Sequence, residues 1–255
     1  MSGGQLRLTT RWALNIVGLA AALAIWQVVS LLIKDPFFPT FTTALSSAVS
    51  LLTGESLHSD VVPSVVRVLI GFVIAGVLGT LVGAVLGSAH GLASYVTPVL
   101  DFIRAVPFPL LLPLAIVIFG LGNTTIISLI VLGAVWPVLL NTFDAARAID
   151  PLQRDVARVC QLPRWQEFFR ITLPAVTPAI VSGLRVALGL CLAVLVVAEM
   201  LGASSGLGHL IVSAEQDFDT PTTYAGVLVL GALGWIMDGL FLMLERHLLR
   251  WMPKA

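Results

Sequence analysis

Four ionisable residues lie within, or at the edge of, long apolar runs, where a charge is costly and marks a candidate functional position. They are Arg67, Arg185, Glu199 and Asp238. If their runs form antiparallel membrane spans, Arg185 and Asp238 lie at similar depth, and we expect a buried ion pair. Contact of Arg185 with an anionic substrate is the rival interpretation. We expect Arg67 to extend toward the membrane surface, and Glu199 to gate or, preferably, to pack the outer end of its span.

The chain lacks the residue patterns that enzymes and metal sites require. It has two lysines, and neither lies in a GxxxxGK[ST] nucleotide loop. Its four histidines are scattered without metal-ligand spacing, and no GxSxG or HExxH sequence occurs. We therefore expect no catalytic residue, no metal site and no cofactor in this chain.

Composition indicates the environment in which these residues act. The chain is 58% hydrophobic and 11% charged, with a mean hydropathy of +1.00, whereas soluble domains average about 25% charged residues. These values predict an all-α integral membrane protein with about six transmembrane helices. The expected spans cover residues 12–33, 63–88, 105–119, 125–142, 175–201 and 221–244. The expected partner is the lipid bilayer, and no nucleic acid is expected.

The distribution of basic residues predicts the orientation of these spans. Most of the 14 Lys and Arg residues fall in the tail 1–11, in the segment 144–174 and near the C-terminus, whereas the expected outer loops hold only Lys34. Cytoplasmic segments are the basic ones in membrane proteins. We therefore expect both termini to be cytoplasmic, with a single transmembrane domain over residues 12–251 and a short tail over 252–255.

Two of the expected spans contain unusual residues. The second span has a small residue at every fourth position, which predicts close helix packing, with pore lining as the alternative: Gly71, Ala75, Gly79, Gly83 and Gly87. The third span holds Pro107, Pro109 and Pro113, which cannot form a regular helix and leave carbonyl groups that need protein or water around them. These prolines are candidates for a translocation pathway, together with Arg185, Glu199 and Asp238.

The most polar stretch between apolar runs is Asp155–Pro174, DVARVCQLPRWQEFFRITLP. Its pattern predicts a helix, a break at Pro163, a short second helix, and an end at Pro174. Alternating charges and aromatic residues favour a docking element over a solvated loop.

This stretch resembles the EAA motif of binding-protein-dependent ABC importer permeases, in which an EAA triplet precedes a Gly and then Ile-x-Leu-Pro. Asp155, Val156 and Ala157 stand at the triplet, Gln161 at the Gly position, and Ile171, Leu173 and Pro174 at the end. Asp, Val and Gln replace the usual Glu, Ala and Gly. The missing Gly puts the turn in doubt, although Pro163 can supply a break.

Further segments are similar to permeases of the sulfonate, taurine and nitrate type. The most specific is VAEMLGASSGLG at residues 197–208, and others lie at 104–122, 183–189 and 244–251. The resemblance implies a type I ABC importer permease in a bacterial inner membrane. It also implies a second copy of the chain, two cytoplasmic ATPase subunits, and an extracytoplasmic binding protein that delivers a small anion.

The resemblance assigns the segment 144–174 the role of coupling ATP hydrolysis to transport. The residues expected to contact the ATPase are Asp155, Ala157, Arg158, Gln161, Pro163, Arg164 and Trp165. A stand-alone secondary transporter or channel subunit is the main alternative, but it leaves this loop unexplained. An ABC exporter half would fit six spans, but it would carry a fused ATPase.

Overall fold

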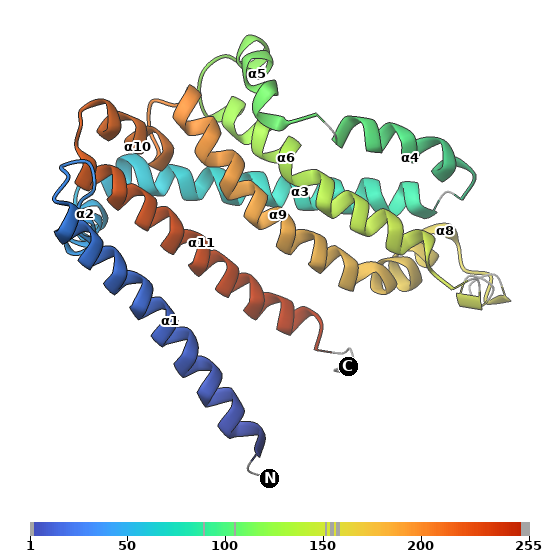
Figure 1. Cartoon of the computed structure of the whole chain (residues 1–255). Helices are drawn as coiled ribbons and strands as arrows, with labels where there is room; N and C mark the ends of the chain where they lie inside the picture. The colour runs from blue at the N-terminus through green and yellow to red at the C-terminus, as the bar shows by residue number, and fades with distance from the viewer. Residues whose placement is uncertain are drawn as a thin grey trace. The chain divides into compact units, whose positions relative to one another are not determined.

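The computed structural model describes residues 3–250, apart from residues 89, 105, 151, 154–155 and 157–158. In these residues every regular element is helical, which confirms the all-α prediction (Figure 1). The chain divides into two compact units, described separately below. The first comprises the residues up to Leu57 and Leu210–Leu230, and the second comprises His58–His209 and the residues from Gly231 onward.

Three helices form the centre of the second unit: α3 (Val62–Ser88), α6 (Asn123–Arg147) and α9 (Leu173–Gly202). Helix α6 packs against both α3 and α9 (Figure 1). The small residues of α3 permit this approach. A Cβ at Gly79 would lie 2.7 Å from Val138 Cβ, and one at Gly83 would lie 2.5 Å from the Leu139 oxygen. The helix-packing interpretation of the small-residue face is therefore confirmed.

The second unit also contains the proline-rich segment. After α4 (His90–Arg104) come the 3-10 turn η2 (Phe108–Leu111) and α5 (Leu112–Phe119). Helix α5 has eight residues, about 12 Å of helix, less than half the hydrocarbon thickness of about 30 Å. Pro113 lies in the first turn of α5, where its missing N–H costs nothing. As predicted, the three prolines prevent one regular helix here.

Helix α11 (Thr220–Leu248) contributes its C-terminal half to the second unit. The Phe241 ring meets the Phe72 ring of α3 edge-on, with centroids 6.0 Å apart. A Cβ at Gly234 would lie 3.2 Å from Leu192 Cδ1 of α9. These contacts place the C-terminal half of α11 beside α3 and α9. Short helices α8 (Arg164–Glu167) and η3 (Phe168–Thr172), the latter π-helical, lead directly into α9.

The first unit consists of α1 (Gly3–Ile33), α2 (Phe41–Thr53), most of α10 (Leu207–Gln216) and the first part of α11. Its described contacts centre on Trp26. The indole N–H donates to the Pro39 oxygen at 3.1 Å, and the ring lies 5.5 Å from the Phe41 ring and 5.8 Å from the Tyr224 ring. This aromatic cluster holds the ends of α1 and α2 beside the start of α11.

Length and hydropathy identify the helices that can cross a membrane. Among the described residues, four qualify: Leu57–Ser88, which includes the π-turn η1 (Leu57–Val61), Asn123–Arg147, Trp165–Gly202 and Thr220–Leu248. Val17–Ile33 and Phe41–Thr53 are shorter apolar helices. The six-span topology and the cytoplasmic placement of the termini stay predictions.

Candidate functional site

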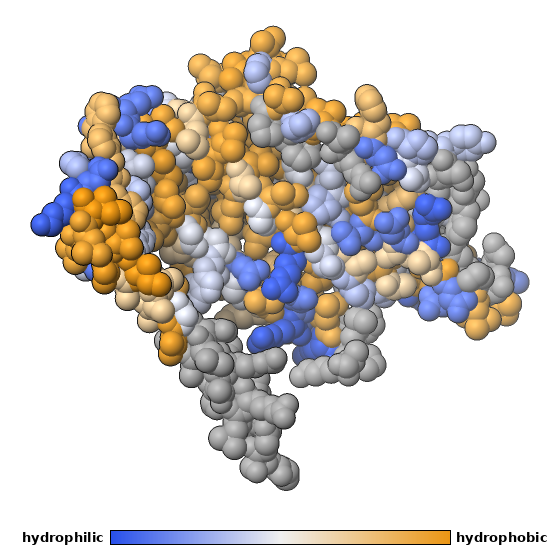
Figure 2. All heavy atoms as spheres, in the orientation of Figure 1, coloured by the Kyte–Doolittle hydropathy of each residue, from blue (hydrophilic) through white to orange (hydrophobic). Residues whose placement is uncertain are grey.

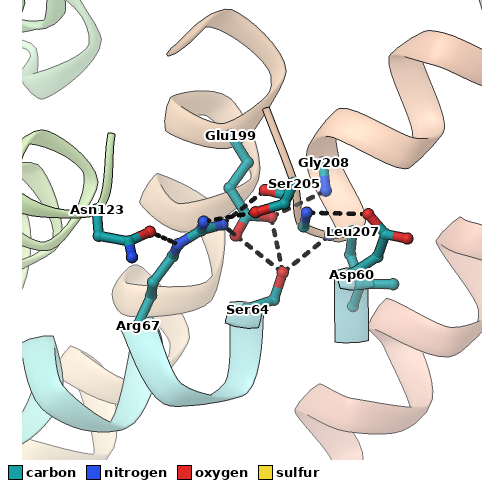
Figure 3. A network of polar contacts seen from close by, with 9 residues as sticks. Asp60, Ser64, Arg67, Asn123, Glu199, Ser205, Leu207 and Gly208 are labelled. Carbon is teal, nitrogen blue, oxygen red and sulfur yellow. Dashed lines mark hydrogen bonds and ion pairs between the residues drawn. The ribbon is translucent and has the colours of Figure 1, made fainter. Parts of the chain in front are cut away.

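A buried ion pair joins α3 to the end of α9 (Figure 3). Arg67 Nη1 lies 2.5 Å from Glu199 Oε1, and the two residues are 5% and 0% exposed. Arg67 lies in the second turn of α3, and Glu199 in the last turn of α9. A pair removed from water in this way is tolerated only when further hydrogen bonds satisfy both groups.

The carboxylate of Glu199 has two more donors. The hydroxyl of Ser64, one turn before Arg67 on α3, lies 2.8 Å from each Glu199 oxygen, and the backbone N–H of Gly208 donates to Oε2 at 3.0 Å. Ser64 Oγ in turn accepts the N–H of Leu207 at 2.8 Å. Leu207 and Gly208 begin α10, so Ser64 and Glu199 cap that helix from other parts of the chain.

The guanidinium of Arg67 is equally well satisfied. Its Nε donates to Asn123 Oδ1 at 2.9 Å, at the first residue of α6. Its Nη1 and Nη2 donate to the backbone oxygen and the hydroxyl of Ser205, at 2.7 and 3.0 Å. We call this set of residues (Ser64, Arg67, Asn123, Glu199 and Ser205, with the N–H groups of Leu207 and Gly208) the clamp.

The turn between α9 and α10 wraps around the Glu199 side chain. Gly206 has φ +119°, a conformation open to glycine, and its N–H donates to Asp60 Oδ1 at 3.1 Å. A Cβ at Gly206 would collide with the Glu199 carboxylate, and one at Gly208 would lie 2.7 Å from Glu199 Cβ. The glutamate, serines and glycines of the segment 197–208 thus serve one local structure.

The clamp shows that the prediction for Arg67 was wrong. The sequence did not predict that these residues form one network. Arg67 does not extend toward a membrane surface, because its side chain is buried and satisfied inside the protein. Glu199 packs the end of its helix, in line with the preferred interpretation. One signal was available in the sequence: Arg67 and Glu199 both fall at the predicted outer side of the membrane, at the start of one span and the end of another, and they carry opposite charges.

A second ion cluster lies between α9 and α11. Arg185 Nε is 3.6 Å from Asp238 Oδ1, and Arg185 Nη1 is 3.9 Å from Glu245 Oε2. The predicted Arg185–Asp238 pair is thus confirmed in position. Its predicted burial is wrong, since these two side chains are 47% and 46% exposed. Figure 2 shows hydrophilic atoms gathered where Figure 1 draws the C-terminal half of α11.

In the segment 144–174, the sequence left open whether the turn forms with Gln161 in place of the usual glycine, and the structure answers this question. The chain ends a helical turn at Cys160, whose N–H donates to the Val156 oxygen at 2.9 Å. Gln161 then adopts φ +49°, the left-handed conformation for which the motif uses glycine. Pro163 precedes α8, and the N–H of Gln166 donates to its oxygen at 2.8 Å. The break therefore forms without the glycine.

The other predicted site residues are only partly visible. Asp155, Ala157 and Arg158 lie outside the described residues, as do the side chains of Arg164 and Pro109. Trp165 is 62% exposed, and Pro107 and Pro113 are also exposed. Among the described residues, no three His, Cys, Asp or Glu side chains gather as a metal site would require.

Comparison with known proteins agrees with this architecture. Residues 75–250 match the family described as "Binding-protein-dependent transport system inner membrane component". The chain belongs to this family. It is therefore the membrane-spanning permease subunit of an ABC importer, located in the bacterial inner membrane, and ATP hydrolysis takes place in a separate subunit. The resemblance inferred from the sequence is confirmed, and a stand-alone transporter is set aside.

Individual relatives match the permease over nearly all of its length. It is 34% identical over 242 residues to the aliphatic sulfonates transport permease protein SsuC of Bacillus subtilis (strain 168), covering 94% of this chain and 88% of the relative. It is 31% identical to the nitrate import permease protein NrtB of Synechococcus elongatus (strain ATCC 33912 / PCC 7942 / FACHB-805), covering 88% and 85%. A chain in an inward-facing structure of the MetNI methionine ABC transporter superposes with a TM-score of 0.66 at 18% identity, covering 76% of the permease and 99% of that chain. This last likeness supports the type I importer fold.

Proposed function

We propose that this permease imports a small anion, such as a sulfonate or nitrate, that an extracytoplasmic binding protein delivers. The observation that carries the proposal is the 34% identity to an aliphatic sulfonates permease across 94% of the chain. The identity extends well beyond the EAA-like segment, which alone would indicate only the superfamily. The nitrate import relative supports the same chemical class.

The coupling segment would dock on the ATPase. Asp155 offers a carboxylate to a partner arginine, a charge-assisted bond, beside Ala157, Arg158 and Arg164. The described part supports this role, because the left-handed Gln161 and Pro163 separate the short helix α8 from the preceding turn. Trp165 then presents a largely exposed indole, 62% accessible, for a partner to cover.

Two copies of the permease would enclose the pathway between them. The support is the half-exposed Arg185–Asp238 pair, which lies well inside two helices long enough to cross a membrane. Charges at such depth are not left against lipid. They face instead a water-filled path or another protein surface, and a pathway between two copies satisfies this requirement. The exposed Pro107 and Pro113 are further candidates for its lining, together with Pro109.

Reconstitution tests the proposal. The permease, its ATPase and its binding protein are placed in liposomes, and uptake of labelled ethanesulfonate, taurine and nitrate is measured with and without ATP. We expect ATP-dependent uptake of at least one of these solutes, and loss of uptake without the binding protein. Uptake that proceeds equally without ATP, or a binding protein that takes none of these anions, would contradict the proposal.

A further inference from the structure

The C-terminal end of α10, in the first unit, departs from the pattern that stabilises helix ends. The N–H of Asp219 donates to the Ala214 oxygen at 2.8 Å, and the N–H of Phe218 donates to the Glu215 oxygen at 3.1 Å. This pair of bonds is a Schellman motif, in which the left-handed residue is usually glycine. Here that residue is Phe218, with φ +58°. A bulky side chain strains the backbone in this conformation.

Packing inside the described part of the chain does not offset this strain. The Phe218 side chain is 74% exposed, and its ring meets the ring of Phe37, itself 59% exposed, with centroids 6.2 Å apart. Charge adds a second local cost, because Glu215 and Asp217 lie at the negative end of the α10 dipole. Costs that gather on an exposed surface without a gain inside the chain indicate that the surface is functional.

The backbone that carries the two phenylalanines is held in place. The hydroxyl of Thr220 donates to the Pro36 oxygen at 2.8 Å and thereby joins the turn before α2 to the start of α11 (Figure 1). The N–H of Phe37 donates to Asp35 Oδ1, also at 2.8 Å. A partner would therefore meet a surface that is already organised, which lowers the entropic cost of binding.

The surroundings of the aromatic pair are acidic. Residues 34–37 and 215–220 hold four exposed carboxylates and one basic residue, Lys34. Aromatic residues inside a charged rim are typical of protein–protein interfaces. A membrane surface fits less well, because the usual interfacial anchors are Trp and Tyr and because anionic headgroups repel carboxylates. The complementary partner is therefore a protein surface with an apolar pocket edged by Lys and Arg.

We propose that this surface is where the extracytoplasmic binding protein docks. The inference rests on the proposed function, in which such a protein delivers the solute, and on the predicted outer placement of both loops. The two phenylalanines enter the partner's apolar pocket and slow dissociation, whereas the carboxylates attract its basic edge and speed association. We call the set the docking patch: Asp35, Phe37, Glu215, Asp217, Phe218 and Asp219.

The test measures the Kd and the rate constants for the binding protein used in the reconstitution, on the permease–ATPase complex in lipid nanodiscs. Phe218→Gly removes an anchor and relieves the left-handed strain. Its Kd should therefore rise about 30-fold, mainly through faster dissociation, while Tm does not fall. Phe102→Ala is the matched control, because Phe102 on α4 is 76% exposed but lies outside the docking patch.

The outcomes separate the docking patch from the proposed function. A Kd of Phe218→Gly within threefold of the unmodified permease, or an equal loss in Phe102→Ala, overturns the docking patch and leaves the proposed function intact. A binding protein that does not bind even the unmodified complex contradicts the proposed function itself.

Two further variants test the charges and the placement. Glu215→Gln combined with Asp217→Asn should slow association about threefold at low salt and weaken its salt dependence; an unchanged association rate would refute the acidic rim. In a Cys160→Ser background, with the buried Cys191 left in place, Gln216→Cys should react with a membrane-impermeant maleimide and be protected by added binding protein. A Gln216→Cys that is unreactive before the binding protein is added places the patch in lipid and overturns the inference.

Discussion

Replacing Glu199 with glutamine removes the negative charge of the clamp while keeping the shape of the side chain. In the unmodified protein, the Glu199 carboxylate accepts hydrogen bonds from Ser64, Arg67 and the N–H of Gly208. Glutamine offers one acceptor oxygen, and its amide N–H₂ must face a group that also donates. Arg67, 5% exposed, is left with an uncompensated charge. Breaking a buried pair in this way costs about 3–5 kcal/mol in free energy of unfolding.

Thermal unfolding of the detergent-purified permease measures this loss. On the scaling known for soluble chains of similar size, Tm falls by roughly 6–20 °C. The matched control is Glu215→Gln on α10, an exposed glutamate, for which we expect a change within about 0.5 kcal/mol. If Glu199→Gln unfolds at the same temperature as the control, the clamp does not stabilise the fold. A double variant, Arg67→Met with Glu199→Leu, removes both charges and should be less destabilised than Glu199→Gln alone.

Three further predictions concern helix packing and coupling. Gly83→Ala places a Cβ 2.5 Å from the Leu139 oxygen and should cost about 1–3 kcal/mol of stability, whereas Gly231→Ala, inside α11 and facing open space, should not lower Tm, because alanine is the better helix former. Gln161→Gly removes the left-handed strain and should stabilise the segment by about 1 kcal/mol with uptake retained; a lower Tm would contradict the φ of +49°. Asp155→Lys should leave the protein inserted while ATP hydrolysis no longer drives uptake, and unchanged uptake would exclude a docking role.

The sequence predicts features that depend on local pattern or on depth in the membrane. The four-residue spacing on α3 predicts a packing face, and equal depth predicts that Arg185 meets Asp238. It does not predict the clamp, since the contact of Glu199 with Gly208 and Ser64 depends on the path of a turn with φ +119° at Gly206. The sequence also does not predict that the Arg185 and Asp238 side chains are exposed, because the spacing of apolar residues does not show which helix covers which face.

The clamp restricts how this permease can change shape. It ties one end of α3, α6 and α9 to the first residues of α10, Leu207 and Gly208, through charges that cannot be separated without leaving one of them buried and unpaired. These helix ends therefore move as a rigid body. We expect any bending of α9 at its opposite end, where Pro178 interrupts the hydrogen-bond ladder and the π-helical η3 precedes the helix. Pro178 and η3 lie directly beside the segment that would meet the ATPase, so movement of that segment would be expected to reach the clamped helix ends through α9.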